Sequence, residues 1–132
     1  MNAGDILEPL TFTVTRGNLV AYADASGDHN PIHQDEEVAR GVGLPGVIAH
    51  GMYTLALVGR AVAEWTDGAE VVDLGAKFTS LVVVPTEGGA EVVVAGTVKS
   101  VADGLVTLAL EVTCDGRKVL GMPKAVVKHA GG

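Results

Sequence analysis

The hydrophobic pattern of the chain changes near residue 70, and this change limits the folds that the chain can adopt. Before it, apolar residues recur at helical spacing, most densely over residues 50–65, where Arg60 and Glu64 are the only charged side chains. A helix that is apolar on nearly all sides is expected to be buried. After residue 70, apolar and polar residues alternate with a period of two, as in half-buried strands. This order predicts an α+β fold with one buried central helix.

Two shorter helices are predicted before the central one. A strand over residues 10–14 leads to Thr15, which suits the N-cap of a helix that ends near Gly27. Asp35 is the N-cap candidate of a second, brief helix, in which two glutamates follow the cap and favour the positive helix end. Gly41 is placed to end that helix. The polar residues between the two helices therefore fall in a loop.

Strand-like alternation recurs in four segments after residue 70, which are 71–84, 91–99, 106–114 and 118–127. The apolar phase of the first segment consists of Val72, Leu74, Ala76, Phe78, Val82 and Val84. Gly88 with Gly89, and Asp103 with Gly104, supply turns between strands. Pro123 cannot donate to a strand ladder, so it indicates an edge or a bulge in the last segment. We expect an antiparallel meander, compatible with a curved sheet around the helix, although the period alone leaves the strand order open.

The composition fits one compact domain over residues 1–132. Hydrophobic residues make up 48% of the chain and aromatic residues 4%, so the core must consist mainly of Val, Leu, Ala and Gly. A chain of this length can bury a core without disulfides or metals as staples. Cys114 is the single cysteine, which excludes an intramolecular disulfide and suits a reducing compartment.

The charge of the chain narrows its partners. A formal net charge of −7 disfavours nonspecific binding to nucleic acid or anionic membranes, because no cluster of Lys and Arg is present to neutralise phosphates. The start of the chain lacks the basic and apolar segments of a secretory signal, and no stretch approaches the roughly 20 apolar residues that span a bilayer. We therefore expect a soluble cytoplasmic protein that binds neither nucleic acid nor membranes.

Residues 22–35, with the sequence YADASGDHNPIHQD, contrast with their surroundings in polar density. Asp28 and His33 lie five positions apart, which in a straight strand would separate them by about 16 Å. Gly27 permits unusual dihedral angles, and Pro31 fixes its own φ, so the segment should form a defined loop. Such a loop can turn both side chains inward. A carboxylate and an imidazole around one water molecule form a general acid/base pair.

A second informative segment, IAHGM at residues 48–52, begins the central helix. Gly51 follows His50 and has no side chain to obstruct a ligand. The first N–H groups of a helix lack partners within the helix and lie at the positive end of its dipole. The Gly51 N–H can therefore stabilise an oxyanion that develops on a bound ligand.

Together, SGDHNPIHQD and IAHGM resemble the motifs of the MaoC-like dehydratases and R-specific enoyl-CoA hydratases, which have hot-dog folds. The resemblance covers most of the chain. It is closest to the single-hot-dog catalytic subunits of actinobacterial (3R)-hydroxyacyl-carrier-protein dehydratases. It implies Asp28 and His33 as the catalytic dyad, Asn30 as a polar support in the site, and the Gly51 N–H as the oxyanion donor. The family uses no metal or redox cofactor.

Some of these residues also have structural explanations. An Asp before Asn-Pro is often only a turn, and a histidine is often only hydrogen-bonded, but within this motif catalysis is the better interpretation of Asp28 and His33. For His50 we favour an orienting role at the helix start over proton transfer. Ser26 matches the resemblance as a supporting residue, although hydrogen bonding within the loop explains it adequately.

Two other functions compete with the dehydratase interpretation. His33, Asp35 and His50 have the ligand types of an iron site with two histidines and one carboxylate. Asp35 is better explained as a helix cap, however. A metal-dependent oxygenase also leaves Asp28, Asn30 and Gly51 without roles. A noncatalytic acyl-binding subunit of a heterodimer would have no need of the Asp28–His33 dyad.

The resemblance implies reversible hydration of a trans-2-enoyl thioester to a (3R)-3-hydroxyacyl thioester, in fatty-acid or polyketide-type metabolism. The sequence does not distinguish CoA from acyl carrier protein as the thioester, nor does it give the acyl length or the direction. About five strands around one helix leave two sheet edges, which soluble proteins cover or pair. We therefore expect a dimer, either of identical chains or with a related hot-dog subunit that lacks the dyad.

Overall fold

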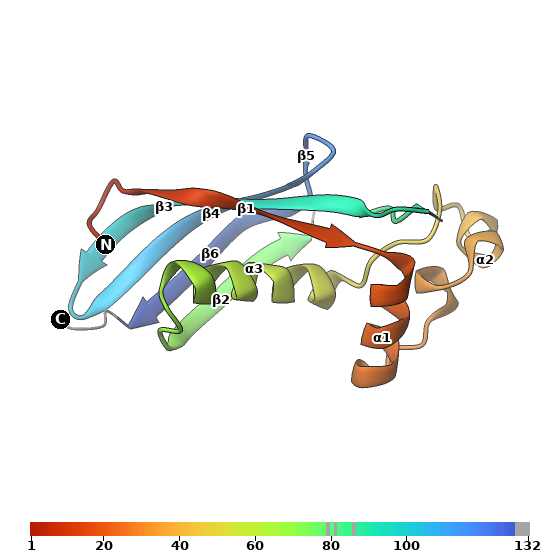
Figure 1. The fold of residues 1–132 in the computed structure, drawn as a ribbon, viewed down its shortest axis with the longest axis horizontal. Coiled ribbons are helices and arrows are strands. Elements are labelled where there is room, and N and C mark those ends of the chain that lie inside the picture. The colour runs from red at the N-terminus through yellow and green to blue at the C-terminus, as the bar shows by residue number, and fades with distance from the viewer. Residues whose placement is uncertain (79, 81, 86, 129–132) are drawn as a thin grey trace.

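The computed structural model describes residues 1–78, 80, 82–85 and 87–128. An antiparallel sheet with one helix along its face makes up most of it (Figure 1). The helices are α1 (Arg16–Ser26), α2 (Glu36–Gly41) and α3 (Gly51–Trp65), with a 3-10 turn, η1, at Pro31–His33. The strands are β1 (Ile6–Val14), β2 (Val71–Phe78), β3 (Ala90–Ala102), β4 (Leu105–Cys114), β5 (Arg117–Lys118) and β6 (Leu120–Lys128).

The two short helices begin and end where the sequence predicts. Thr15 caps α1, because its side chain accepts from the Asn18 N–H while the Asn18 side chain accepts from the Thr15 N–H. Gly27 ends this helix in the left-handed conformation, with a φ of 80°, which glycine adopts readily. The Asp35 side chain caps α2 by accepting from two N–H groups of its first turn. Both helices lie beyond the end at which α3 begins (Figure 1).

The strands follow the order β1-β3-β4-β6-β2, and the short β5 pairs with β4. All neighbours are antiparallel, and β3, β4 and β6 form the predicted meander. Asp103 and Gly104 form the turn between β3 and β4. Their φ angles of 55° and 75° are both positive, which is the backbone conformation of a tight two-residue hairpin turn. β2, the first strand after α3, does not pair with β3, the next strand in the sequence, because β2 lies beside β6. As a result, β1 and β2 are the two edges of the sheet.

Valine side chains of the meander build the core together with α3. In β3 the inward residues Val92, Val94 and Val98 are at most 2% exposed, which confirms the predicted alternation. From α3 the buried apolar residues are Leu57, Val58, Ala61 and Val62. The expectation that α3 is buried on nearly all sides is wrong for a single copy of the protein. The sheet covers only one side of the helix, and Met52 is 59% exposed. Among the described residues, no helix combines the length and hydrophobicity that a membrane crossing requires.

The predicted strand over residues 71–84 is shorter in the structure. β2 ends at Phe78, and residues 79 and 81 lie outside the described part. The alternation predicts that Val72 and Phe78 are buried, yet their side chains are 52% and 56% exposed. The reason is the place of β2 at the sheet edge, where a side chain has a neighbouring strand on one side only. Alternation therefore identifies the strand but overestimates its burial.

Pro123 lies at a bulge and not at an edge. β6 is internal, between β4 and β2. Gly75 pairs with Lys124 and Lys77 pairs with Gly121, so one residue of β2 stands opposite two residues of β6. The bulge leaves Pro123 out of the regular ladder, which accommodates a residue without an N–H inside the sheet.

Candidate functional site

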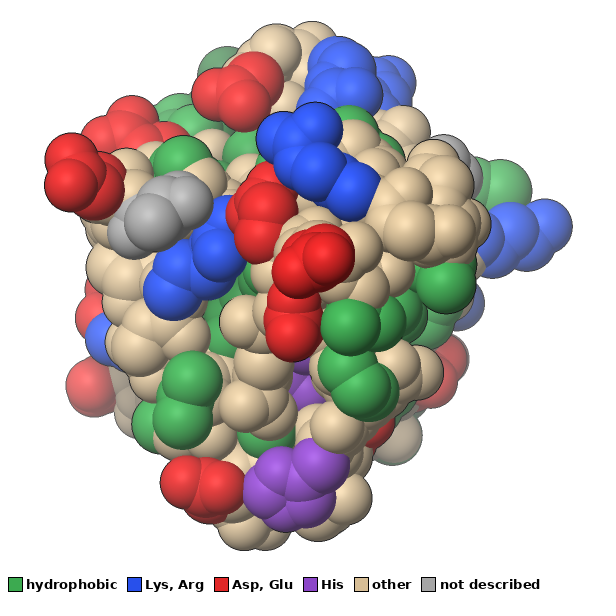
Figure 2. All heavy atoms as spheres, turned by 90° about the vertical axis from the view of Figure 1, so that its right-hand side faces the viewer, with side chains coloured by type: hydrophobic (Ala, Val, Ile, Leu, Met, Phe, Trp, Pro, Cys, Tyr) green, Lys and Arg blue, Asp and Glu red, His purple; other side chains and the backbone are tan. Residues whose placement is uncertain are grey.

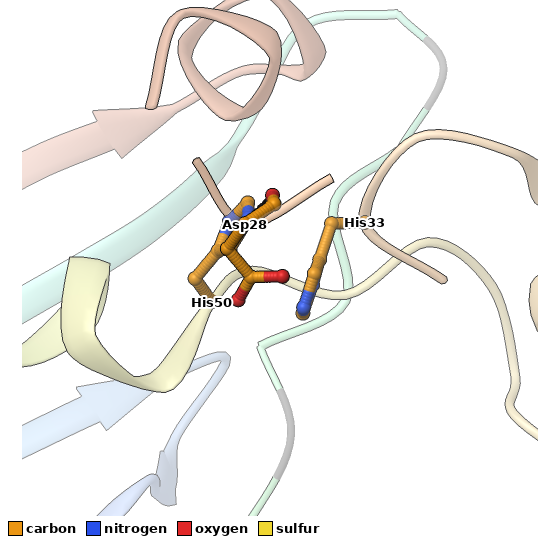
Figure 3. Close-up of side chains that lie close together, drawn as sticks. All are labelled: Asp28, His33 and His50. Atoms are coloured by element: carbon orange, nitrogen blue, oxygen red, sulfur yellow. Dashed lines mark hydrogen bonds between the residues drawn. The ribbon is translucent and has the colours of Figure 1, made fainter. Parts of the chain in front are cut away.

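Three polar side chains from separate elements meet near the start of α3 (Figure 3). Asp28 comes from the loop after α1, His33 from the end of η1, and His50 from the N-cap position of α3. One nitrogen or oxygen atom from each lies within 4.8 Å of those from the other two. The histidines are 8% and 2% exposed, whereas Asp28 is exposed. The expected proximity of Asp28 and His33 is present, and His50 joins them.

A series of short hydrogen-bonded turns brings Asp28 to this position. The Ser26 Oγ accepts from the Asp28 N–H at 3.2 Å, and the Asp28 Oδ1 accepts from the Asn30 N–H at 3.3 Å. The Asn30 Oδ1 then accepts from the Ile32 N–H at 3.2 Å and so caps η1. Ser26 and Asn30 therefore support the site by shaping its loop, because both bind backbone amides with their side chains.

The orientation of His33 follows from one hydrogen bond. Its Nδ1 lies 2.8 Å from the carbonyl oxygen of Ile48, and a carbonyl only accepts, so Nδ1 carries the proton. The neutral ring then has an unprotonated Nε2 with a free lone pair. The Ile48 N–H in turn donates to the Ile32 carbonyl at 3.2 Å, which joins η1 to the segment before α3. His33 is thus held in the tautomer that can accept a proton at Nε2.

His50 contacts both members of the proposed dyad. Its Nε2–H donates to the backbone oxygen of Asp28 at 3.1 Å. Its ring stacks on that of His33, with centroids 3.8 Å apart and planes inclined by 22°. The Tyr22 ring also packs against the His50 ring, with centroids 4.7 Å apart. His50 makes no side-chain cap bond to α3, so its contacts support the predicted orienting role, exerted on the dyad more than on the helix.

Gly51 is the first residue of α3, and its amide belongs to the free end of the helix. The first backbone bond of α3 runs from the Thr54 N–H to the His50 carbonyl, so the amides before Thr54 have no partner within the helix. A Cβ placed on Gly51 would meet ring carbons of Phe78 at 3.0 to 3.3 Å. A side chain at position 51 would therefore have to displace the Phe78 ring.

A cavity of about 200 Å³ opens beside these groups. Its lining combines one of the three polar site residues with mainly apolar side chains: His33, Ile48, Ala49, Gly51, Thr54, Phe78, Ser80, Val82, Val119 and Leu120. Figure 2 looks onto this end of the molecule and shows histidine side chains among acidic and hydrophobic ones. The site thus offers an acid/base pair, a helix N-terminus and an apolar space next to one another.

A cluster of ion pairs next to the site connects α1, α2 and the segment that contains Val84. Arg16, at the start of α1, forms an ion pair with Glu36 of α2 and donates from Nε to the Val84 carbonyl at 2.7 Å. Arg40 also pairs with Glu36, at 3.1 Å. The hydrogen bond from Arg16 is the main cause that lowers the pKa of the Glu36 carboxyl below its usual 4.5. Sequence reasoning missed this cluster, because its members come from three separate segments.

The segment that Arg16 binds carries the start of α3. The Val84 N–H donates to the Val47 carbonyl at 2.8 Å, and the Ala49 N–H donates to the Val82 carbonyl at 2.9 Å. Val82 and Val84 are buried, as the apolar pattern predicts, but they pair with residues 47–49 instead of extending β2. Arg16 therefore stabilises the backbone that holds Ile48, Ala49 and the residues after them.

Asp28, His33 and His50 also have the donor types of a metal site. Asp35, the carboxylate considered from the sequence, caps α2 and is not the third member. A nitrogen lone pair lies in the plane of its imidazole ring. Two nearly parallel rings whose centroids are 3.8 Å apart direct their lone pairs side by side, and not toward one ion at about 2.1 Å from both. This arrangement favours proton transfer over metal binding.

Phe78 and Thr54 line the cavity, and neither was singled out from the sequence. Thr54 falls one helical turn after His50, a spacing that could have indicated a shared helix face. Phe78 is far from Gly51 along the chain. Only the position of β2 at the sheet edge brings its ring to Gly51, and the strand order is not contained in the alternation.

A profile of the family described as MaoC like domain matches residues 3–115. The 3-hydroxyacyl-thioester dehydratase X of Mycobacterium tuberculosis is 38% identical over 77 residues, which cover 58% of this chain and 26% of that protein. The mitochondrial 3-hydroxyacyl-[acyl-carrier-protein] dehydratase of Arabidopsis thaliana is 32% identical over 87 residues, which cover 66% of this chain and 52% of that protein. The matches therefore span about a quarter and about half of these two relatives.

Solved structures match nearly the whole chain. One described as a MaoC-like dehydratase has a TM-score of 0.94 and 33% identity, with 98% of this chain and 41% of that one covered. An R-hydratase from Pseudomonas aeruginosa has a TM-score of 0.85 and 25% identity, with 97% and 82% covered. These likenesses confirm the predicted hot-dog fold. Since the family match also extends over most of the sequence, the chain belongs to the MaoC-like dehydratase family.

Proposed function

We propose that the chain catalyses the reversible hydration of trans-2-enoyl thioesters to (3R)-3-hydroxyacyl thioesters, and is thus a hydro-lyase. The observation that carries the proposal is the closeness of Asp28 to His33, together with the cavity that His33 lines with Gly51 at the N-terminus of α3. A base, an acid and an oxyanion donor are what the addition of water to a conjugated thioester requires. The names of the similar dehydratases support the same class of reaction.

In the proposed mechanism, Asp28 and His33 share one water molecule. As the water oxygen bonds to C3 of the enoyl group, the dyad takes one proton from the water and delivers one proton to C2. The electron pair of the C2–C3 double bond forms the new C2–H bond by way of the thioester enolate. The reverse sequence removes water from the 3-hydroxyacyl thioester. The reaction is neither an oxidation nor a reduction, so proton transfers complete it.

The proposed task of Gly51 is to stabilise the enolate. Negative charge develops on the thioester oxygen while C3 is attacked, and the Gly51 N–H lies at the positive end of α3. Removal of one such donor in other enzymes slows the reaction by about 10²–10³-fold. Because this donor is a backbone amide, no substitution at position 51 except proline removes it directly.

We propose that residues 1–132 act as one hot-dog domain within a dimer. β1 and β2 have no second neighbour in the described sheet, and exposed edges of this kind are normally paired or covered. Two Mycobacterium tuberculosis structures of the same fold are described as the ChsH1-ChsH2 and HadBC complexes. A partner hot dog, identical or related, would also cover the open side of α3.

The activity is tested by offering the purified chain trans-2-enoyl-CoA substrates and following the loss of absorbance of the conjugated thioester. We expect turnover, with the (3R) alcohol as product on chiral analysis. A carrier-protein thioester of the same acyl group, assayed in parallel, shows which carrier is preferred. If neither carrier supports turnover, with or without a related hot-dog partner, a noncatalytic acyl-binding subunit becomes the better description and the enzyme proposal is wrong.

A further inference from the structure

We infer that Tyr22, a residue of α1 outside the proposed dyad, positions both members of the dyad by way of an aromatic stack. This inference rests on the function proposed above and names a further residue for its reaction. Four rings from three elements contact one another in turn: Tyr53 of α3, Tyr22 of α1, His50 at the N-cap of α3 and His33 of η1. Tyr22 therefore joins α1 to the rings beside His33.

The ring geometry is that of attractive aromatic pairs. Tyr22 meets Tyr53 edge to face, with centroids 5.3 Å apart and planes inclined by 84°. The Tyr22 and His50 centroids are 4.7 Å apart, with planes inclined by 45°. Aromatic pairs at about 4.5–7 Å attract one another beyond the effect of surface burial, and a tyrosine ring loses little conformational entropy when it is held. Tyr22 therefore restricts the His50 ring, which in turn lies against the His33 ring at 3.8 Å.

Tyr22 also affects the position of Asp28. The tyrosine lies beside Leu19 and Ala23, the buried residues of α1, on one face of this helix. α1 ends two residues before Asp28, so the direction of the helix sets where the loop with the carboxylate begins. The His50 Nε2–H, which the stack orients, donates to the Asp28 backbone oxygen at 3.1 Å. Tyr22 thus acts on the dyad in two ways, through the end of α1 and through His50.

The stack lies outside the cavity that His33 and Gly51 share. Tyr22, Tyr53 and His50 are not among the described residues that line it, so none of these three rings is placed to bind the hydrocarbon of a substrate. An acid/base pair, in contrast, is sensitive to position, and a displacement of about 1 Å can slow a reaction by about 10²-fold. Loss of the Tyr22 ring should therefore lower kcat and leave KM nearly unchanged.

The kinetic test compares three variants with the wild type on one trans-2-enoyl-CoA substrate. Tyr22→Phe keeps the ring and removes only the hydroxyl, so kcat should stay within about twofold of the wild type. Tyr22→Leu removes the ring and should lower kcat about three- to tenfold, the range expected for one lost aromatic pair. Tyr53→Leu is the matched control, because it removes the same kind of ring from the end of the stack away from the histidines, and it should change kcat less than about twofold.

A second measurement needs no turnover. Ring currents shift the NMR signals of protons that lie near an aromatic ring, so the Cε1–H and Cδ2–H signals of His50 should move in Tyr22→Leu and stay nearly unchanged in Tyr22→Phe. Thermal unfolding of each variant separates positioning from a general loss of stability. Tyr22→Met replaces Tyr22→Leu in both measurements if the leucine variant unfolds.

Three results would overturn the inference: an unimpaired Tyr22→Leu, a Tyr22→Phe as slow as Tyr22→Leu, or a kcat that follows the thermal midpoint across all the variants. The second result would assign the effect to the hydroxyl and not to the ring. A wild type without turnover would overturn the proposed function instead. In that case the NMR signals still show whether Tyr22 holds His50, so the two failures are distinguishable.

Discussion

Asp28 lies exposed in its loop, so its carboxylate can be neutralised without disturbing the core. In Asp28→Asn the remaining side-chain oxygen can still accept from the Asn30 N–H, which keeps the turn. We expect kcat to fall by about 10²–10⁴-fold, the usual contribution of a general acid or base, while the thermal midpoint stays near that of the wild type. Steady-state kinetics and thermal unfolding monitored by circular dichroism measure the two effects.

His33→Ala should lower kcat to a similar extent, but with some loss of stability, because the bond to the Ile48 carbonyl disappears from a buried position. The double variant Asp28→Asn with His33→Ala should be little slower than the slower single variant, since both groups serve one step. Near-normal kcat in either single variant, or full additivity of the two effects on a logarithmic scale, would contradict a shared role.

His50 permits a sharper test of orientation, because its Nδ1 is a buried atom without a hydrogen-bond partner among the described residues. In His50→Phe an aromatic ring can still stack on His33, but the hydrogen bond to the Asp28 backbone is lost. A typical hydrogen bond contributes about 0.5–1.5 kcal/mol, so kcat should fall up to about tenfold, with KM and stability little changed.

His50→Ala is the comparison for this variant, because it removes the stacked ring as well and should slow the reaction further. Proton transfer by His50 itself predicts a different pattern, in which the phenylalanine and alanine variants are equally slow and lose at least a hundredfold in kcat. Kinetics of the two proteins under the same conditions distinguish orientation from proton transfer.

Residues of the candidate site could be predicted where they lie close together within a sequence motif. The Asp28 loop follows from Gly27 and Pro31, and the Gly51 amide follows from the start of an apolar helix. The stacking of His50 on His33 and the approach of Phe78 to Gly51 could not be predicted. Both contacts join segments that are far apart in the sequence. The hydrophobic pattern of one segment does not say which other segment it packs against, so these contacts are visible only in the folded structure.

At the scale of elements, Arg16 joins α1 and α2 to the segment that holds the start of α3. In Arg16→Met the hydrocarbon part of the side chain remains, but the bond to the Val84 carbonyl is lost. A hydrogen bond from a charged group contributes about 1.5–3 kcal/mol, so the free energy of unfolding in urea should fall by about that amount. kcat should also fall, because residues 47–49 lose a support, and KM for a short substrate should change less.

Arg40→Met is the matched control for Arg16. Arg40 pairs with the same Glu36 carboxylate but is 64% exposed and makes no contact with Val84 among the hydrogen bonds described, so it should change kcat little. Equal losses of kcat in the two variants would mean that the ion pairs stabilise α2 generally and that the Val84 bond has no special effect on the site.

The contribution of this ion-pair cluster to protein stability should depend on pH, because it includes the Glu36 carboxyl. Arg16 lowers the pKa of Glu36 in the folded protein below the usual 4.5, so the unfolded chain binds the proton more tightly. The resulting stabilisation is present above pH 4.5 and is lost as the pH falls through the lowered value. Urea unfolding at pH 7 and below pH 4 should therefore show a difference between wild type and Arg16→Met that narrows on acidification. A difference that widens instead would contradict this assignment.

Helices and strands could be predicted from the sequence where capping residues mark their ends and where the spacing of apolar residues indicates their type. Thr15, Gly27 and Asp35 mark helix ends by local chemistry, and the structure agrees with all three. The order of the strands is different in kind, because alternation fixes which face of a strand is apolar and not which strand lies beside it. The place of β2 at an edge therefore could not be predicted, and of the edge or bulge that Pro123 indicates, the structure has the bulge.

At the scale of the whole molecule, one edge of the sheet carries several exposed apolar side chains. The edge strand β2 carries Val71, Val72 and Phe78 at 40%, 52% and 56% exposure, and Met52 of α3 is 59% exposed. Edge strands that carry exposed apolar side chains invite pairing with another chain. Because Phe78 also borders the cavity, pairing at this edge would place the partner next to the cavity.

Light scattering coupled to size-exclusion chromatography should therefore give twice the mass of the chain at micromolar concentration, or a one-to-one complex when a related hot-dog subunit is supplied. Val72→Lys places a charge on the exposed edge and should shift the protein toward monomer, as lysine does on natural edge strands. Val42→Lys is the control, because Val42 is 65% exposed at the end of α2, away from the sheet. Because a partner paired at β2 would lie beside the cavity, the monomeric variant should lose activity in proportion to its dissociation. A wild type that is monomeric and fully active over this concentration range would show that one hot dog is sufficient and that the β2 edge remains unpaired.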